Sequence, residues 1–311
     1  MSKLSSESRE EAINKHLKAA EIAKTIKTQL LPNIVSPNAN LLVIAETIEK
    51  KIKELGGLPA FPVNICIGHV AAHYTPLKNE KTTIPDDTII KIDFGIHIDG
   101  YIVDTAISYY FGEENEINDM IITAREAVNI AVKKMKPGVK LSDIGSTIED
   151  FVNDRGYKVI ENLNGHLLEE YNLHGEKEVP VSSRVAATGI VEKDEVYAIE
   201  VFVTNGEGWA RSTDDIRIYS VISKLPKRLP IHVKAAREIL RVLIRERKEL
   251  PFTPRWLLDR FNEAEIRVAI ATLEKVGILI PYPVLIEKEG SIVAQAEETV
   301  IVTSDGAKII T

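Results

Sequence analysis

Two aspartates, Asp93 and Asp104, lie eleven residues apart with an Asp-Gly pair between them at 99–100. Apolar residues alternate with other side chains over 90–96, which is the period of two of a half-buried β-strand. An Asp-Gly pair after such a strand is typical of a two-residue hairpin turn. This turn would set Asp93 opposite Ala106 and direct Asp104 to the same face, with about 7 Å between the two Cβ atoms.

Two carboxylates held this close repel each other, and their pKa values rise unless a cation lies between them. Chance placement of aspartates near a hairpin is the alternative to a divalent metal ion. Further ligand types favour the metal, because His166, Glu200 and Glu297 each adjoin a strand-like apolar run. The five residues together predict a metal centre.

The composition indicates a globular protein, since 44% of its 311 residues are hydrophobic. Its one cysteine, Cys66, excludes an intramolecular disulfide and a cysteine-rich zinc site. No apolar run approaches the roughly 18 residues of a membrane span, and the N-terminus has no apolar signal core. We therefore expect a cytoplasmic protein without a membrane anchor.

The net charge of −7 argues against general nucleic-acid binding, but the charge is unevenly distributed. Residues 222–255 carry ten basic and three acidic side chains, a net charge of +7 against −14 for the rest of the chain. The ten are Lys224, Lys227, Arg228, Lys234, Arg237, Arg241, Arg245, Arg247, Lys248 and Arg255. Such a segment is either a solvated helix face or a surface for an anionic partner, and it marks a separate module.

The chain resembles itself at an offset of one hundred residues. Thr-Ile-Glu occurs at 47–49 and again at 147–149, and glycines follow at Gly56 and Gly156. The pattern predicts two similar α/β halves related by a pseudo-twofold axis.

Each half begins with a pair of predicted helices, over 7–30 and 41–55 in the first and 117–135 and 142–155 in the second. The helices would cover one face of an antiparallel sheet and leave the other for chemistry. His16, in the first helix, is expected to face solvent.

Three helical patterns and a strand interrupt the closing strands and predict a winged-helix-like insert. They span 232–250, 254–261, 263–276 and 278–285. We expect a catalytic domain of residues 1–221 and 282–311 and an insert of residues 222–281.

Four carboxylates and one imidazole form an oxygen-rich set that favours Mn(II), Fe(II), Co(II) or Mg(II). Four negative charges exceed what one divalent ion balances, so two ions about 3.5–4 Å apart fit better. Such a pair lowers the pKa of a water between them and stabilises a tetrahedral oxyanion. The expected chemistry is metal-assisted hydrolysis.

Six strings of the sequence resemble those of methionine aminopeptidases, which have the pita-bread fold. They are 72–76 (AHYTP), 91–95 (KIDFG), 99–105 (DGYIVDT), 164–166 (NGH), 198–200 (AIE) and 295–297 (QAE). The insert, with 250–252, 255–257 and 281–285, is similar to the type 2 class of archaea and eukaryotes. The resemblance covers nearly the whole chain.

The resemblance implies a role for each candidate ligand. Asp93 would bind one ion and His166 the other, with Asp104 and Glu297 bridging the two. Glu200 would be both a ligand and the general base for the attacking water. The ions would be two divalent cations from among Co, Mn, Fe and Zn.

Other residues match positions that contact substrate in the family. His73 and His174 would contact the scissile amide or the developing oxyanion and help to protonate the leaving amine. Phe61 and Asn64 resemble the wall of the methionine pocket, and Tyr282 its mouth, although structural packing explains these three equally well.

The implied function is removal of the initiator methionine from nascent polypeptides whose second residue is small. We expect a cytoplasmic monomer, although the sequence leaves the oligomeric state open, and the basic segment suggests an approach to ribosomes. Two residues depart from the family pattern: Val201 replaces a common proline, and Glu298 replaces a common histidine. Glu298 is expected to face away from the metals and change only the surrounding electrostatics.

Two alternatives remain. An Xaa-Pro dipeptidase or aminopeptidase shares the fold, but such enzymes usually have a large N-terminal domain, whereas about 60 residues precede the first motif here. A non-catalytic homologue of the proliferation-associated type would have lost ligands, whereas all five are present.

Overall fold

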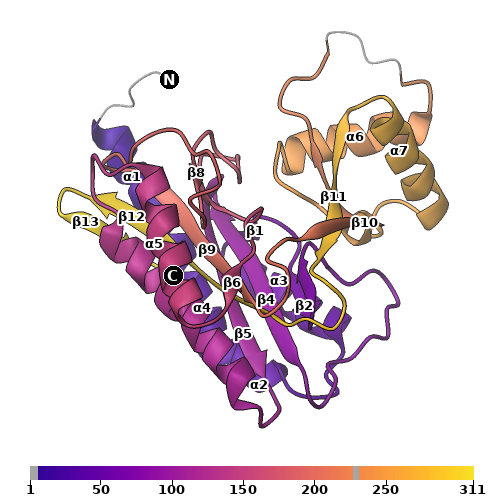
Figure 1. Ribbon diagram of the computed structural model, residues 1–311. Coiled ribbons are helices and arrows are strands. Elements are labelled where there is room, and N and C mark those ends of the chain that lie inside the picture. Colours follow the sequence, from indigo (N-terminus) through magenta and orange to yellow (C-terminus); the bar gives the residue numbers. More distant parts are fainter. Residues whose placement is uncertain (1–5, 227–230) are drawn as a thin grey trace.

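A long antiparallel sheet forms the body of the protein in the computed structural model, which describes residues 6–226 and 231–311 (Figure 1). Lys227 and Arg228 of the basic segment lie outside these residues. In spatial order, the main strands are β1 (Leu58–Pro59), β4 (Ile89–Ile98), β5 (Tyr101–Tyr110), β12 (Val293–Thr303), β9 (Val196–Thr204), β7 (Gly165–Leu167) and β8 (Glu178–Val179). Three further strands pair with β4, β9 and β12, respectively: β2 (Asn64–Ile67), β6 (Lys158–Val159) and β13 (Gly306–Ile309).

The hairpin of β4 and β5 has the predicted register. Asp99 and Gly100 have φ values of +50° and +92°, as a type I′ turn requires. Asp93 therefore pairs with Ala106, and Asp104 pairs with Gly95. The prediction that both aspartates share one face is confirmed.

The duplicated helices are also confirmed. Helices α3 (Leu41–Glu54) and α5 (Leu141–Asp154) begin and end one hundred residues apart, and the glycines that follow them both have positive φ. The first helix of each pair is α1 (Ser6–Thr25) in the first half and α4 (Asn115–Lys134) in the second. Helix α1 continues through the π-helical turn η1 (Ile26–Leu30) into α2 (Leu31–Ile34). No helix of the described residues combines the length and apolar content needed to cross a membrane.

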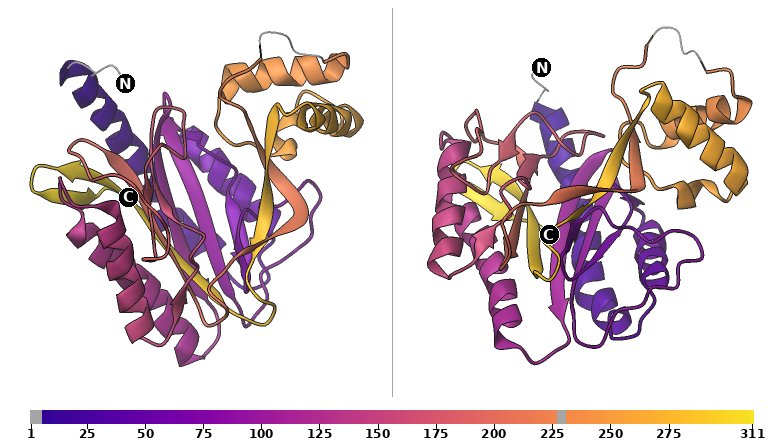
Figure 2. Two further views of the ribbon diagram at one scale, coloured as in Figure 1. Left: turned by 45° about the horizontal axis from the view of Figure 1, so that its top comes forward. Right: turned by 45° about the vertical axis from the view of Figure 1, so that its right-hand side comes forward.

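The insert extends from the body on two paired strands, β10 (Arg211–Val221) and β11 (Leu279–Ile286), with β3 (Val70–Ala72) at the edge (Figure 2). It contains α6 (Lys234–Glu246), η2 (Pro254–Leu257) and α7 (Glu263–Lys275). The helix predicted over 254–261 is wrong, because only the single 3₁₀ turn of η2 forms there. The predicted strand over 278–285 agrees with β11 to within one residue.

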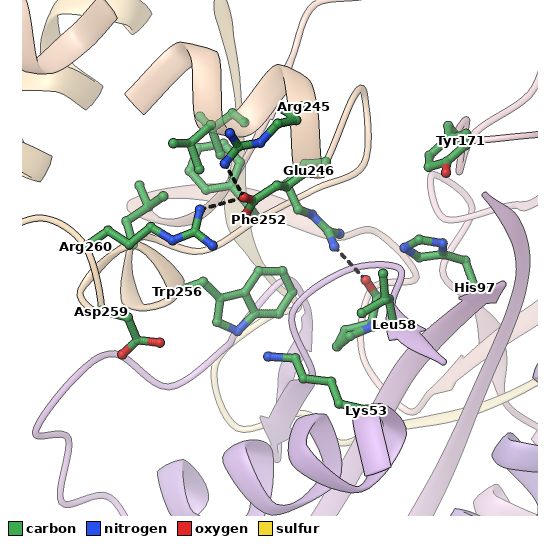
Figure 3. Close-up of a pocket in the computed structure, with 15 residues that line it drawn as sticks. Lys53, Leu58, His97, Tyr171, Arg245, Glu246, Phe252, Trp256, Asp259 and Arg260 are labelled. Atoms are coloured by element: carbon green, nitrogen blue, oxygen red, sulfur yellow. Dashed lines mark hydrogen bonds and ion pairs between the residues drawn. The ribbon is translucent and has the colours of Figure 1, made fainter. Parts of the chain in front are cut away.

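Two basic residues of the +7 segment, Arg247 and Arg255, lie at the junction between insert and body. Figure 3 shows this junction around Trp256 of the insert and Leu58 of the body. Arg255 donates to both carboxylate oxygens of Glu49, at 2.8 and 2.9 Å, and this ion pair is buried. Arg247 donates to the carbonyl oxygens of Pro59, Ala60 and Pro251. These two arginines therefore attach the insert and are not free for a distant partner.

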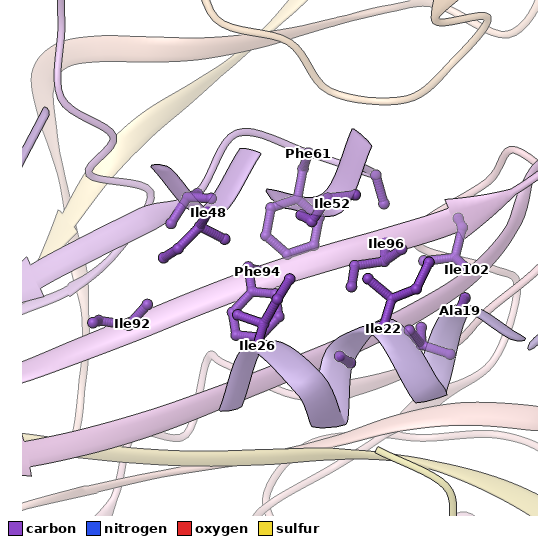
Figure 4. Close-up of a cluster of buried hydrophobic side chains, with 14 of the residues drawn as sticks. Ala19, Ile22, Ile26, Ile48, Ile52, Phe61, Ile92, Phe94, Ile96 and Ile102 are labelled. Atoms are coloured by element: carbon purple, nitrogen blue, oxygen red, sulfur yellow. The ribbon is translucent and has the colours of Figure 1, made fainter. Parts of the chain in front are cut away.

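Apolar side chains fill the space between the sheet and its helices. Figure 4 shows Ile22 and Ile26 of the N-terminal helix against Phe94 and Ile96 of β4. In the second half, Val201 of β9 belongs to the cluster under α4 and is fully buried. The Val201 side chain, which departs from the family pattern, therefore faces the helices, on the opposite side of β9 from Glu200.

The expectation that His16 faces solvent is wrong. Its side chain is buried, and Nδ1 donates to the carbonyl oxygen of Ile102 at 2.7 Å. The reason is tertiary: α1 lies flat against β4 and β5, and this turn of the helix meets the sheet.

Candidate active site

Three of the predicted ligands occupy one row across four neighbouring strands. Asp93 of β4 pairs with Ala106 of β5, Ala106 pairs with Glu297 of β12, and Glu297 pairs with Glu200 of β9. Paired residues of a sheet share a face. The three carboxylates therefore lie on the face that the helices leave uncovered.

The other two ligands form the adjacent row. Asp104 is two residues from Ala106 on β5, and His166 pairs with Ala198, two residues from Glu200 on β9. His166 Nε2 lies 3.8 Å from Asp104 Oδ2. The potential ligand atoms of Asp104, His166 and Glu297 all lie within 4.8 Å of one another.

Burial gives these carboxylates unusual electrostatics. Desolvation raises the pKa of Asp93 to about 7. Desolvation, followed by mutual repulsion, raises the pKa values of Asp104, Glu200 and Glu297 well above the ordinary range. Cations among the four would compensate both effects.

Unpartnered atoms at the centre fit the same interpretation. Asp93 Oδ1, Asp104 Oδ1 and His166 Nδ1 are buried and have no hydrogen-bond partner within residues 6–226 and 231–311. Desolvation, and then His174, lowers the pKa of His166 far below its usual value, which keeps the imidazole neutral and able to bind a metal. The donor set therefore fits divalent metal ions.

All ten predicted site residues line one cavity. They are Phe61, Asn64, His73, Asp93, Asp104, His166, His174, Glu200, Tyr282 and Glu297. Leu163, Leu173, Phe202, Ile218 and Pro251 also line it, and the sequence analysis missed them. Phe202 could have been found, because it shares the face of Glu200 by the period of two. Ile218 and Pro251 carry no such local signal.

Two histidines and a tyrosine form one wall of this cavity. His73 has φ of +65°, and its Nδ1 donates to the Pro283 carbonyl oxygen at 3.0 Å, which leaves Nε2 as an acceptor in the neutral ring. The Tyr282 ring packs edge-on to His73 at 5.5 Å and stacks on His174 at 6.2 Å. Desolvation lowers the pKa of His73, and desolvation with repulsion from His73 lowers the pKa of His174 to about 4.

Glu298 points away from the cavity, as predicted. Lys27 Nζ donates to its two carboxylate oxygens at 2.7 and 2.9 Å, and Thr311 Oγ1 donates to it at 2.6 Å. The negative charge of Glu298 is thus paired with Lys27 on the face of the sheet opposite to the cavity.

Comparison with known proteins agrees with this geometry. Residues 14–220 match the model of metallopeptidase family M24. A methionine aminopeptidase from Thermococcus onnurineus is 39% identical over 95% of this chain and 98% of its own. The structure of a thermophilic Arx1 has a TM-score of 0.82 at 18% identity, covering 96% of this chain and 90% of that one. The structure of a methionine aminopeptidase from Thermotoga maritima has a TM-score of 0.69 at 19% identity, covering 97% and 96%.

Proposed function

This chain belongs to metallopeptidase family M24 and is a metal-dependent aminopeptidase that removes N-terminal methionine, and we propose that it is a type 2 enzyme with two metal ions. The fold is the pita-bread fold that the sequence predicted. The observation that carries the function is the pair of adjacent rows holding Asp93, Glu297 and Glu200 beside Asp104 and His166. The insert and the similarity to the Thermococcus relative support the type 2 class.

The proposed ligand assignment follows the two rows. Asp93 would serve one ion and His166 the other, Asp104 and Glu297 would be shared, and Glu200 would complete the set. Two divalent ions, from among Co, Mn, Fe and Zn, would supply the Lewis acidity that makes water nucleophilic at neutral pH.

The remaining chemistry is assigned to side chains of the chain itself. Glu200 accepts a proton from the attacking water and passes it towards the leaving amine. His73 accepts a hydrogen bond from the scissile amide through Nε2, because its Nδ1 is committed to Pro283. His174, on the same wall, contacts the developing oxyanion and helps to protonate the leaving amine.

The cavity wall supports the proposed specificity. Phe61 is buried, and Asn64 pairs with Asp93 across β2 and β4. Asn64 Oδ1 has no hydrogen-bond partner in the part of the chain that the structure describes. Phe61 and Asn64 would bound the methionine side chain, and Tyr282 would lie at the mouth. A narrow cavity admits a small second residue more readily than a large one.

One experiment separates the candidate activities. The metal-depleted protein is assayed with Mn(II), Fe(II), Co(II) or Zn(II) on Met-Ala-Ser and on an Xaa-Pro peptide. We expect metal-dependent release of methionine from the first peptide. A preference for the Xaa-Pro peptide, or cleavage without metal, would overturn the proposal.

The remaining assignments concern the protein's surroundings. We propose a cytoplasmic monomer that consists of a catalytic domain (1–221 and 282–311) and an insert (222–281). Arg237, Arg241 and Arg245 of α6 are exposed, which supports an approach of the insert to the ribosome. If replacing these three with glutamine leaves salt-sensitive ribosome association unchanged, the ribosomal proposal fails.

A further inference from the structure

Two loops from distant parts of the chain meet beside the catalytic cavity. The first, residues 168–177 between β7 and β8, brings Leu173 to the cavity wall. The second, residues 247–253 between α6 and η2, brings Pro251 to the same wall. Phe61, the proposed wall of the methionine pocket, lines this cavity as well. The separation of the two loops therefore contributes to the width of the methionine pocket.

The sheet fixes Phe61, and the loops form the side of the pocket that can move. A Cβ atom added at Gly95 of β4 would overlap the Phe61 ring, so this ring lies directly on the strand. Leu173 and Leu250, one from each loop, are buried in the cluster that contains Phe61. Loops are more mobile than the elements they connect. A change in the width of the pocket therefore depends on how firmly the two loops are held together.

One side-chain contact at the surface joins the two loops. Lys248 Nζ lies 3.3 Å from the centroid of the Tyr171 ring, which is the arrangement of a cation–π pair. Lys248 forms no ion pair among the described residues, although Glu169 and Glu170 border the same surface hollow. Within the part of the chain that the structure describes, no hydrogen bond links the two loops. Lys248 and Tyr171 thus form the clasp between them.

The backbone holds both residues of the clasp in place. Tyr171 has φ of +57° and Lys248 has φ of +52°, a region that side chains of this size rarely adopt. The Tyr171 amide donates to the Gly100 carbonyl oxygen at 2.8 Å, and a Cβ atom added at Gly100 would overlap the Tyr171 ring. His97 packs edge-on to the same ring at 5.7 Å (Figure 3). The hairpin of β4 and β5 therefore fixes the ring, and Lys248 attaches the insert to it.

We propose that the clasp sets the width of the methionine pocket and so determines how strictly the enzyme rejects a longer first side chain. With the clasp closed, Leu173 and Pro251 stay close to Phe61, and a side chain longer than methionine is excluded. Without the clasp, the loops separate and the pocket accepts an extra methylene group. Lys248 and Tyr171 are positioning residues, because neither lines the catalytic cavity. This proposal rests on the proposed function, which assigns Phe61 to the methionine pocket.

The test compares Met-Ala-Ser with ethionine-Ala-Ser, whose first side chain is one methylene group longer. In a hydrophobic pocket, one methylene group changes kcat/KM by about 10–200-fold. The metal-loaded wild type should therefore favour the methionine peptide at least about tenfold. Lys248→Gln and Tyr171→Leu should each lower this ratio about two- to fivefold, the factor that one exposed cation–π pair supplies, mainly through a lower KM for the ethionine peptide. An unchanged ratio in both variants would overturn the proposal.

Conservative variants distinguish the clasp from a general loss of structure. Lys248→Arg keeps a cation and Tyr171→Phe keeps a ring, so both should retain the wild-type ratio. Lys234→Gln removes the same charge from an exposed position at the start of α6, and the ratio should persist there too. Combining Lys248→Gln with Tyr171→Leu should lower the ratio no further than either change alone, because both act through one contact. Additive losses, or a lower ratio in Lys248→Arg or Lys234→Gln, would show that the clasp is not the cause.

Product binding separates the shape of the pocket from catalysis. Free methionine and free ethionine occupy the pocket without turnover, and the ratio of their inhibition constants should change in the same variants and by the same factor. Failure of the wild type to cleave Met-Ala-Ser would refute the proposed function and the clasp with it. Equal cleavage of the two peptides by the wild type would refute the assigned pocket. Normal cleavage of Met-Ala-Ser with unchanged ratios in the clasp variants would refute the clasp alone.

Discussion

Thr299 and Asp104 are joined by two hydrogen bonds across β12 and β5: the Asp104 amide donates to Thr299 Oγ1, and Thr299 Oγ1 donates to the Asp104 carbonyl oxygen, both at 2.7 Å. These two strands form a paired position only at Glu297 and Ala106. The Thr299 hydroxyl therefore takes the place of backbone hydrogen bonds at this seam, the contact between β5 and β12 that brings Asp104 beside Glu297.

Replacing Thr299 with valine should weaken this seam. The change leaves a buried N–H and C=O of Asp104 without partners, which costs about 1–3 kcal/mol. We expect a lower free energy of unfolding in urea and weaker Mn(II) binding by calorimetry. Thr303→Val is the matched control on the same strand, because its hydroxyl bonds within its own turn, donating to the Gly306 carbonyl and accepting from the Asp305 amide. Equal losses in both variants would contradict a special role of Thr299.

Glu200→Gln should keep the fold and lose most of the turnover. The amide cannot accept the proton of the attacking water, and general-base catalysis contributes about 10²–10⁴-fold. The measurement is kcat on Met-Ala-Ser at saturating metal, with circular dichroism to check the fold. Glu192→Gln, just before β9, should leave kcat unchanged. Near-normal turnover of Glu200→Gln would refute the assignment of the base.

Metal binding should release protons. Desolvation raises the pKa of Asp93 to about 7, so the metal-free site is partly protonated at neutral pH. Desolvation and mutual repulsion also raise the pKa values of Asp104, Glu200 and Glu297 well above their ordinary range. Ligands must be ionised to bind, so affinity should rise as the pH rises from 6 to 8. Calorimetry at pH 7 in buffers of different ionisation enthalpy counts the protons. Binding heats independent of the buffer would contradict this expectation.

His16 should make the fold sensitive to acid. Desolvation lowers its pKa from 6.5 to about 4, so between these values the unfolded chain binds a proton that the folded chain does not. Its contribution to stability is complete above pH 6.5 and is lost as the pH falls to about 4, up to about 3 kcal/mol.

The test compares urea unfolding of the chelator-treated protein at pH 7 and pH 5. His16→Gln should lose less stability than the wild type over this interval. His232→Gln, at an exposed position, should follow the wild type. Parallel losses in all three proteins would show that His16 does not contribute.

Local patterns were enough to predict the parts of the site that lie close together in the chain. The Asp-Gly turn and the period of two determined that Asp93 and Asp104 share a face, because a two-residue loop leaves one register. The repeat at one hundred residues predicted α3 and α5 for the same reason, since helix periodicity and a glycine stop are local signals. Short strings that resemble the family's motifs suggested His166, Glu200 and Glu297. These strings did not show how the three side chains come together in space.

Tertiary structure decided what depends on distant contacts. Ala106 meets Glu297 because β5 and β12 are neighbours, and no local period specifies which strands pair across such a separation. Residues 254–261 do not complete a helix, and Arg255 there is held by the buried carboxylate of Glu49. His16 is buried for a similar reason, because the sheet covers its turn of α1. The sequence by itself predicted the candidate ligands and determined the hairpin that carries two of them, whereas packing between distant segments determined the cavity that unites them.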